Sequence, residues 1–225
     1  MNKKELVQKY RFLVSSACSV HNLRNFLRIK GRSGNRLEAP CALLKGVRIH
    51  FSGKNNRVVI GDFSIVKNVE LYISGDNNVV EIGPWCHLNQ AVFCTEDNGN
   101  QIRIGEKTRI LGSTELAAIE GTQITIGRDC LFSSGIHVRT GDSHSVLNLE
   151  GKRINPSADV SIGDHVWVGM KAMCLKGAAV ADHSIVGAGT LVTKKFTQPH
   201  CALAGVPAKV VNEGIDWDLS RIPVE

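Results

Sequence analysis

The hexapeptide NVVEIG at residues 78–83 decides the fold, because close variants of it lie on either side at equal distances. These are NRVVIG at 56–61, NQIRIG at 100–105 and TQITIG at 122–127. Successive copies start 22 residues apart. A fixed period of this length predicts a solenoid in which each repeat forms one turn. A fifth copy, ADVSIG at 158–163, follows the fourth by 36 residues, so it marks an insertion.

After residue 162 the period shortens to six. The first position of each hexapeptide is aliphatic or Cys, and the fifth is small or β-branched. We infer a triangular coil in which three short edges close one turn, with first positions filling the interior and fifth positions fitting tight corners. Cys86 and Cys130 fall in this corner column beside Ser64 and Thr108. They are therefore predicted to pack as small hydrophobes in the core.

The composition is that of an ordinary globular protein with a small aliphatic core. The 225 residues are 43% hydrophobic, 21% charged and only 5% aromatic. The seven Cys lack C-x-x-C spacing, which argues against a disulfide scaffold or a zinc site and favours a reducing cytoplasm. No run of 18 apolar residues predicts a transmembrane helix, and the N-terminus shows no convincing signal peptide.

Residues 1–34 are predicted to form a helical segment that caps the first coil. Tyr10, Leu13, Val14 and Ala17 follow the spacing of one helix face. The segment carries much of the excess in a net charge of +6. A solvated basic helix is the preferred interpretation, with peripheral membrane contact through this segment left open and no nucleic-acid partner expected.

The coil itself is predicted over residues 35–211, followed by a C-terminal tail at 212–225. Stepping by six from Ile126 gives Phe132 and Val138, which suit the interior, and then His144, which does not. We therefore place the insertion at about residues 140–156, as a loop ejected from the coil. Two bare 18-residue coils are the alternative. Loops on a rigid scaffold often carry functional sites.

The hexapeptide array resembles the hexapeptide-repeat acyltransferases. Segments 162–169 (IGDHVWVG), 186–194 (VGAGTLVTK) and 204–211 (AGVPAKVV) are similar to the C-terminal signature of the maltose, galactoside and streptogramin acetyltransferases. GDSHS at 141–145, followed by Trp167, also resembles the capsular polysaccharide and sialic acid O-acetyltransferases. The resemblance implies an all-β solenoid, a left-handed parallel β-helix. It also implies a homotrimer that binds acetyl-CoA between adjacent coils, with active sites at the subunit interfaces.

Three residues are implied to be catalytic by this resemblance. His144 would be the general base that takes the proton of the acceptor hydroxyl, a task that suits a neutral imidazole near pH 7. Asp142 would either orient that imidazole or cap the loop, and both readings stay open. Trp167 would pack beside the His and the CoA arm. No metal is expected to be required, and a Cys nucleophile is disfavoured because the loop contains no Cys.

The resemblance also implies residues for the acyl donor. Gly169, Ala188 and Gly189 would let the pantetheine arm approach the backbone, whereas Thr193, Lys194 and Lys209 would meet the nucleotide end. The family often has a second basic residue three positions after Lys209, where this chain has Asn212.

The sequence thus leads to an acetyl-CoA-dependent O-acetyltransferase that modifies a sugar hydroxyl, in the synthesis of a capsule, lipopolysaccharide or exopolysaccharide. The alternatives are an N- or O-acetyltransferase of a small molecule, such as an amino sugar or antibiotic, and a non-catalytic β-helix scaffold. Among the other His, His165 and His183 are expected on the surface, and His137 is a candidate for lining the acceptor pocket.

Overall fold

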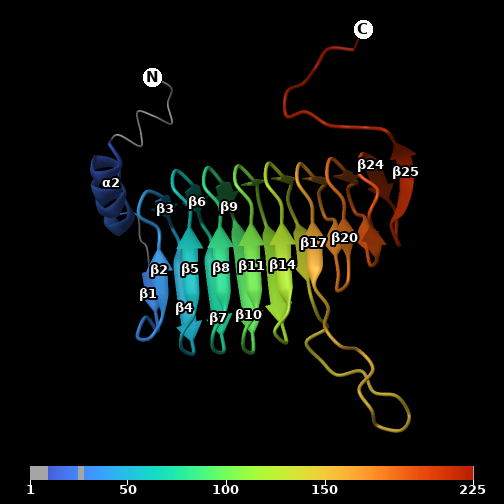
Figure 1. Ribbon diagram of the computed structural model, residues 1–225, viewed down its shortest axis with the longest axis horizontal. Coiled ribbons are helices and arrows are strands. Elements are labelled where there is room, and N and C mark those ends of the chain that lie inside the picture. The colour runs from blue at the N-terminus through green and yellow to red at the C-terminus, as the bar shows by residue number, and fades with distance from the viewer. Residues whose placement is uncertain (1–9, 25–27, 225) are drawn as a thin grey trace.

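The computed structural model describes residues 10–24 and 28–224 (Figure 1). One helix, α2 (Arg11–Arg24), lies at one end of a long coil of short strands, as Figure 1 shows. The chain passes repeatedly from sheet B to sheet C to sheet A, and three corners join these faces. The fold is a left-handed parallel β-helix, as predicted.

The three sheets run the length of the coil, and all neighbouring strands are parallel except the last pair, β24 and β25. Sheet A contains β1 (Arg28–Lys30), β4 (Arg48–Ser52), β7 (Glu70–Ser74), β10 (Ala91–Glu96), β13 (Thr114–Ile119), β16 (Ile136–Arg139), β19 (Met173–Cys174) and β22 (Leu191–Val192). Sheet B contains β2 (Arg36–Glu38), β5 (Arg57–Ile60), β8 (Val79–Ile82), β11 (Gln101–Ile104), β14 (Gln123–Ile126), β17 (Val160–Ile162), β20 (Ala179–Val180) and β23 (Lys195–Phe196). Sheet C contains β3 (Leu43–Lys45), β6 (Ile65–Lys67), β9 (His87–Asn89), β12 (Arg109–Ile110), β15 (Leu131–Phe132), β18 (Trp167–Val168), β21 (Ile185–Val186), β24 (Cys201–Ala204) and β25 (Lys209–Glu213).

The strand register confirms that the five repeats stack on one another. Ile60, Ile82, Ile104, Ile126 and Ile162 pair in that order along sheet B. Since Ile126 pairs directly with Ile162, the stretch between them forms a single turn that contains an insertion. The alternative of two bare coils is therefore wrong, and the loop lies where it was predicted.

The corner column also has the predicted packing. Cys86 and Cys130 are 1% exposed and lie in the hydrophobic core. The Ser64 hydroxyl donates to the Gly83 carbonyl at 2.8 Å and accepts from the Cys86 N–H at 3.0 Å. The corner residues therefore both fill space and satisfy the backbone of the adjacent turns.

A ladder of buried Asn side chains crosses the A–B corner of the first coils. The side-chain oxygen of Asn56 accepts from the Asn78 N–H at 2.8 Å, and that of Asn78 accepts from the Asn100 N–H at 2.8 Å. The amides of Asn56 and Asn78 also donate to carbonyls of the next turn, for example Asn78 to Asp97 at 3.0 Å. This explains why the first three copies of the repeat begin with Asn, a feature that the sequence left without a reason.

Helix α2 caps the first coil, but it ends earlier than predicted, and a different face of the helix lies against the coil. Strand β1 already begins at Arg28, and the expected helical stretches 1–9 and 25–27 lie outside the described residues. Leu13 is 64% exposed, whereas Cys18 and Asn22 are buried. Asn22 turns inward because its amide donates to the Ala42 carbonyl at 3.0 Å and accepts from the Leu44 N–H at 2.8 Å. These bonds occupy backbone groups that the open end of the coil would otherwise leave unpaired.

At the other end, strand β25 crosses the expected boundary at residue 212, because it continues to Glu213 against β24. The chain then turns back over the coil (Figure 1). None of the helices within the described ranges is long and apolar enough to cross a membrane.

Candidate active site

The inserted loop leaves sheet A after β16 and returns to sheet B at β17, at the A–B corner. It projects well beyond the coil (Figure 1). Leu147 and Arg153 form an antiparallel bridge, and the Ile154 N–H donates to the Val146 carbonyl at 2.8 Å. The loop is therefore a folded hairpin that carries its own hydrogen bonds.

Asn155 braces the base of the hairpin and is 7% exposed. Its amide donates to the carboxylate of Asp142 and to the carbonyl of His144, both at 2.8 Å. Its oxygen accepts from the Val146 N–H at 2.7 Å. The backbone of His144 is thus fixed by a buried side chain that sequence reasoning missed, because no motif distinguishes this Asn from an ordinary loop residue.

Asp142 contacts Lys176 from the next coil as well as Asn155. The Lys176 ammonium, followed by the Asn155 amide, holds the pKa of Asp142 below its ordinary value. The Lys176 contact ties the loop to the coil, and the Asn155 contact closes the base of the loop itself. No hydrogen bond joins this carboxylate to the His144 ring within the described residues, where its side-chain partners are Lys176 and Asn155.

A second anchor lies on the other side of the loop base. Glu120 pairs with Arg153 and accepts a hydrogen bond from the Ser157 hydroxyl at 2.7 Å. Arg153 and then Ser157 lower the pKa of Glu120 to about 2. Two carboxylates, Asp142 and Glu120, therefore clamp the two ends of the loop that carries His144. The His144 side chain itself is exposed.

Most of the predicted donor residues lie elsewhere, on sheet C and the C–A corner. Trp167 points outward from β18, 38% exposed, with its indole N–H 3.4 Å from the Ser133 hydroxyl. Ala188 and Gly189 are exposed at the corner after β21, and a Cβ on Gly189 would meet only open space. Gly189 has φ +66°, a left-handed conformation that Gly adopts without cost.

Gly169 lies at the same corner one coil earlier but is buried. A Cβ there would come within 2.7 Å of the Ala188 backbone nitrogen. The absence of a side chain at Gly169 is thus already required by the stacking of the coils. Thr193 and Lys194 are exposed at the A–B corner after β22, and Lys209 is exposed on β25. The structure therefore divides the predicted site residues between two places, the A–B corner and the sheet C side.

The Cys residues match the prediction that they are structural. Burial raises the pKa of Cys86 to about 12 and that of Cys130 to about 11. A thiol with such a pKa is protonated at neutral pH and is a poor nucleophile.

A groove of about 430 Å³ lies along sheet A, and His137 contributes to its wall. The ring of His137 is 3.5 Å from Glu115, whose carboxylate also pairs with Arg139 at 3.2 Å. Glu70 and Gln90 also line this groove. It offers several hydrogen-bonding side chains beside the strand that leads into the loop.

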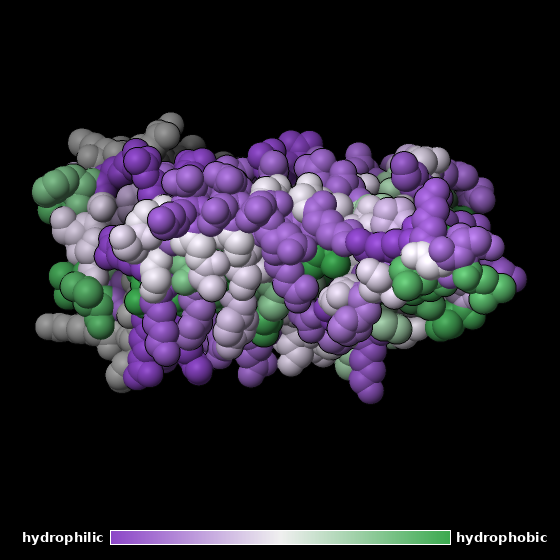
Figure 2. All heavy atoms as spheres, turned by 90° about the horizontal axis from the view of Figure 1, so that it is seen from below, coloured by the Kyte–Doolittle hydropathy of each residue, from purple (hydrophilic) through white to green (hydrophobic). Residues whose placement is uncertain are grey.

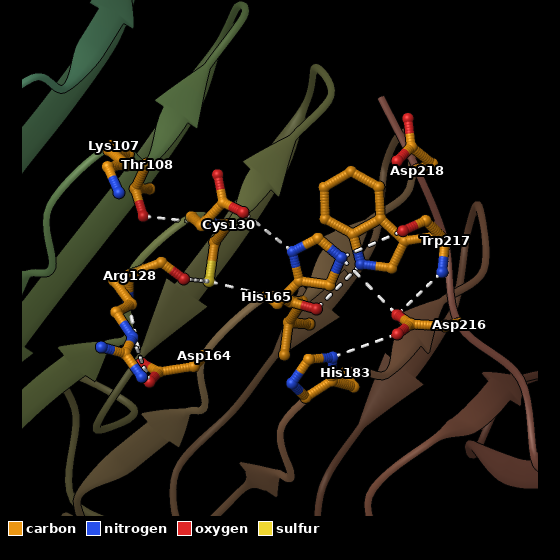
Figure 3. A network of polar contacts seen from close by, with 12 residues as sticks. Lys107, Thr108, Arg128, Cys130, Asp164, His165, His183, Asp216, Trp217 and Asp218 are labelled. Carbon is orange, nitrogen blue, oxygen red and sulfur yellow. Dashed lines mark hydrogen bonds and ion pairs between the residues drawn. The ribbon is translucent and has the colours of Figure 1, made fainter. Parts of the chain in front are cut away.

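The B–C corner contains a network that the sequence did not predict (Figure 3). His165 is not a simple surface residue, because its side chain is 23% exposed and both ring nitrogens have partners. Ligating atoms of His165, His183 and Asp216 lie within 4.8 Å of one another, as a metal site would need. Since each of these atoms already faces a polar partner within the network, we interpret it as a hydrogen-bonded cluster.

Comparison with known proteins identifies the family. The solved structure of the polysialic acid O-acetyltransferase OatWY superposes with a TM-score of 0.82 and 31% identity, over 88% of this chain and 93% of that chain. The chain belongs to the hexapeptide-repeat acyltransferase family. The structure of NeuO, a polySia-specific acetyltransferase, is also similar, with a TM-score of 0.74 and 29% identity over 87% of this chain and 89% of that one. No model of a protein family matches the sequence.

Curated family members match the chain in part. The polysialic acid O-acetyltransferase of Neisseria meningitidis is 34% identical over 108 residues, which are 48% of this chain and 50% of that protein. The galactoside O-acetyltransferase of Escherichia coli K12 is 32% identical over 105 residues, 46% of this chain and 50% of that protein. The chain thus spans about half the length of these curated relatives.

Proposed function

We propose that this family member transfers an acetyl group from acetyl-CoA to a sugar hydroxyl, in the synthesis of a surface polysaccharide such as a capsule, lipopolysaccharide or exopolysaccharide. The similarity to OatWY, a polysialic acid O-acetyltransferase, over 93% of that chain carries the proposal. The galactoside O-acetyltransferase relative supports the same reaction on a different sugar. Fold alone implies no reaction, so the residues of the site must also fit the proposed chemistry.

The sheet C side fits an acyl-CoA donor. An exposed indole at Trp167, beside the open backbone of Ala188 and Gly189, suits an extended apolar arm. Lys209 on this side and Lys194 at the A–B corner are exposed cations that suit phosphates, as modest and salt-dependent contacts. Asn212 adds no second charge after Lys209, so Lys194 takes on more of that role.

His144 is our candidate for the general base. It accepts the proton of the acceptor hydroxyl as that oxygen attacks the thioester carbonyl, and it returns the proton to the departing sulfur. Asn155 and Asp142 hold the base of the loop so that the backbone of His144 keeps one position. A backbone N–H at a coil corner is expected to stabilise the negative charge on the carbonyl oxygen.

A homotrimer would bring the two halves of the site together. Within one chain, His144 lies on a loop from the A–B corner, whereas Trp167 projects from sheet C. Figure 2 views the molecule from the side on which the loop projects. It shows an apolar patch near the C-terminal end of the coil. The exposed apolar side chains of the loop are Val146, Leu147, Leu149 and Ile154. Such a patch is typical of a surface that docks on a partner, and we propose that the loop reaches the sheet C side of a second copy.

Two further parts of the proposal concern acceptor and location. The groove beside Glu115 and His137 could hold sugar hydroxyls through its polar side chains. All seven Cys are free, which agrees with a cytoplasmic location beside the CoA pool.

The test is release of CoA thiol by purified protein with acetyl-CoA and a panel of sugar acceptors. His144→Ala should lower kcat about 100-fold to 10,000-fold, as expected for loss of a general base. His87→Ala, an exposed His on β9 without a proposed role, is the matched control and should keep full activity. Activity retained by His144→Ala would remove His144 from the mechanism. Turnover with amino sugars or antibiotics alone would favour the small-molecule alternative, and no turnover with any acceptor would favour a scaffold.

A further inference from the structure

The C-terminal segment Ile215–Trp217 docks on the B–C corner by paired hydrogen bonds. The Ile215 N–H donates to the His200 carbonyl, and the His200 ring lies 3.1 Å from the Ile215 carbonyl. The Trp217 indole donates to the His165 carbonyl at 2.8 Å, and the His165 Nε2 lies 3.0 Å from the Trp217 carbonyl. The Trp217 and His165 rings also stack, with centroids 4.3 Å apart and 10° between their planes (Figure 3).

Three His occupy the same corner position in successive coils. His165, His183 and His200 have left-handed φ values of 52°, 55° and 59°, which turn their side chains outward in one column. Ring centroids are 5.1 Å apart between His165 and His183 and 4.8 Å apart between His183 and His200. The column therefore presents one imidazole per coil to the returning chain.

The partners of His165 require two protons on its ring. Nδ1 lies 3.0 Å from the Asp129 carboxylate, and Nε2 faces the Trp217 carbonyl. A carboxylate and a carbonyl are both acceptors, so both nitrogens must donate, and only the imidazolium form can do so. The docked segment is therefore complementary to a cationic His165.

The surrounding charges favour that cation. Asp129 faces His165 from the preceding coil, His183 from the following coil, and Asp216 and Asp218 from the C-terminal segment. Partial burial lowers the pKa of His165, but the bonds to Trp217 and Asp129 and the nearby carboxylates outweigh it and leave the pKa raised. Other charged or titratable groups at this corner are Arg128 and Asp164, which pair with each other, Asp182, and His200.

The docked segment places Trp217 beside Trp167, with ring centroids 6.3 Å apart at 47°. We propose that Trp217 forms a second aromatic wall of the donor site, and that protonated His165 is the positioning residue that holds it there. This inference rests on the proposed function, because it takes Trp167 as part of that site.

The direction of the pH dependence follows from the raised pKa. A group whose pKa is higher in the folded state stabilises that state fully below its unfolded pKa, about 6.5 for His, and loses this effect as pH rises through the folded value. The clasp between His165 and Trp217 should therefore be tight below about pH 6.5 and should loosen at higher pH.

The first experiment measures acetyl-CoA binding and kinetics at pH 6. Trp217→Ala should raise KM for acetyl-CoA and weaken CoA binding in calorimetry about threefold to tenfold, with kcat nearly unchanged. Trp85→Ala is the matched control, since Trp85 packs against Phe63 at the same corner of earlier coils and should leave KM unchanged. Equal binding by wild type and Trp217→Ala would overturn the inference. Failure of the wild type to bind CoA would instead overturn the proposed function.

The second experiment isolates the clasp. The chain has three Trp, so Trp85→Phe combined with Trp167→Phe leaves Trp217 as the sole indole. Acrylamide quenching of its fluorescence should be weak at pH 6 and strong at pH 9, and adding His165→Gln should give strong quenching at both. Quenching that does not change with pH in the protein that retains His165 would contradict the proposal that protonated His165 holds Trp217. Quenching that rises at pH 6 when EDTA is added would contradict it as well.

Discussion

The coils before the inserted loop and those after it solve the same packing problem differently. In the earlier coils, 22-residue turns stack through buried Asn side chains such as Asn56 and Asn78. In the later coils, 18-residue turns have no such ladder, although their apolar residues pair as in the earlier coils, for example Val180 with Ile162. The later coils instead pair neighbouring turns at the exposed B–C corner, where Asp182 accepts from the Asp164 N–H at 2.8 Å.

The two regions therefore have different roles: the earlier coils stabilise the fold, and the later coils carry the surfaces where a ligand or the returning chain can bind. Buried amides that accept and donate between turns make the early coils a rigid stem. The shorter turns leave open backbone at Gly189 and outward rings at Trp167 and His165, where a ligand or the returning chain can bind. The loop with His144 leaves the coil at the boundary between the two regions.

The sharpest way to break this comparison is to remove one rung of the Asn ladder. Asn78→Leu should lower the free energy of unfolding by about 3 kcal/mol, because the buried N–H of Asn100 and the Asp97 carbonyl lose their partner. Chemical denaturation measures it. Asn89→Ala, at a side chain whose bond to the Leu111 carbonyl is 3.4 Å long and exposed, is the control and should cost less than about 1 kcal/mol. Equal losses of unfolding free energy in the two variants would show that the Asn ladder has no special role in stability.

A matched pair of Thr residues sharpens the comparison at one hexapeptide position. Thr108 donates to the Gly127 carbonyl at 2.9 Å and accepts from the Cys130 N–H at 3.0 Å. The buried Thr190 hydroxyl has no hydrogen-bond partner within the described residues. Thr108→Val should therefore cost about 2 kcal/mol, whereas Thr190→Val should be neutral or stabilising by up to about 1 kcal/mol. Thermal and chemical unfolding measure the stability of the two variants. A large loss of stability in Thr190→Val would show that its hydroxyl has a hydrogen-bond partner.

The smallest effect concerns the anchor of the loop at the boundary. The pKa of Glu120 is lowered to about 2 by Arg153 and Ser157. A lowered carboxyl pKa stabilises the folded loop above its ordinary value near 4.5 and loses this effect as pH falls toward 2. Pepsin should therefore cleave the loop faster at pH 2 than at pH 4, relative to an unstructured peptide.

Glu120→Gln serves as the reference for that measurement. It lacks the charge at every pH, so the ratio of its cleavage rate to that of the wild type should fall toward one as pH approaches 2. Glu150→Gln changes an exposed acid of the same loop and should behave as the wild type. A constant ratio for Glu120→Gln would show that the ion pair does not hold the loop.

Periodic parts of the molecule were predictable, and the non-periodic contacts were not. The repeat placed Ile126 and Ile162 in the core and located the loop, because each turn must present the same positions to its neighbours. The inward face of α2 was predicted wrongly, since an Asn that binds two backbone groups of the first coil outweighed the apolar spacing. Asn155 carried no signal at all.

The sequence by itself determined the coil, its period, the place of the insertion and the family, because each depends on residues that recur at fixed spacing. Only the tertiary structure decided that Asp142 binds Lys176 from the next coil and that His165 binds Trp217 from the chain end. These contacts join residues 34 and 52 positions apart. Such pairings depend on how far one turn lies from the next and where the tail returns, and no local pattern in the chain encodes those distances.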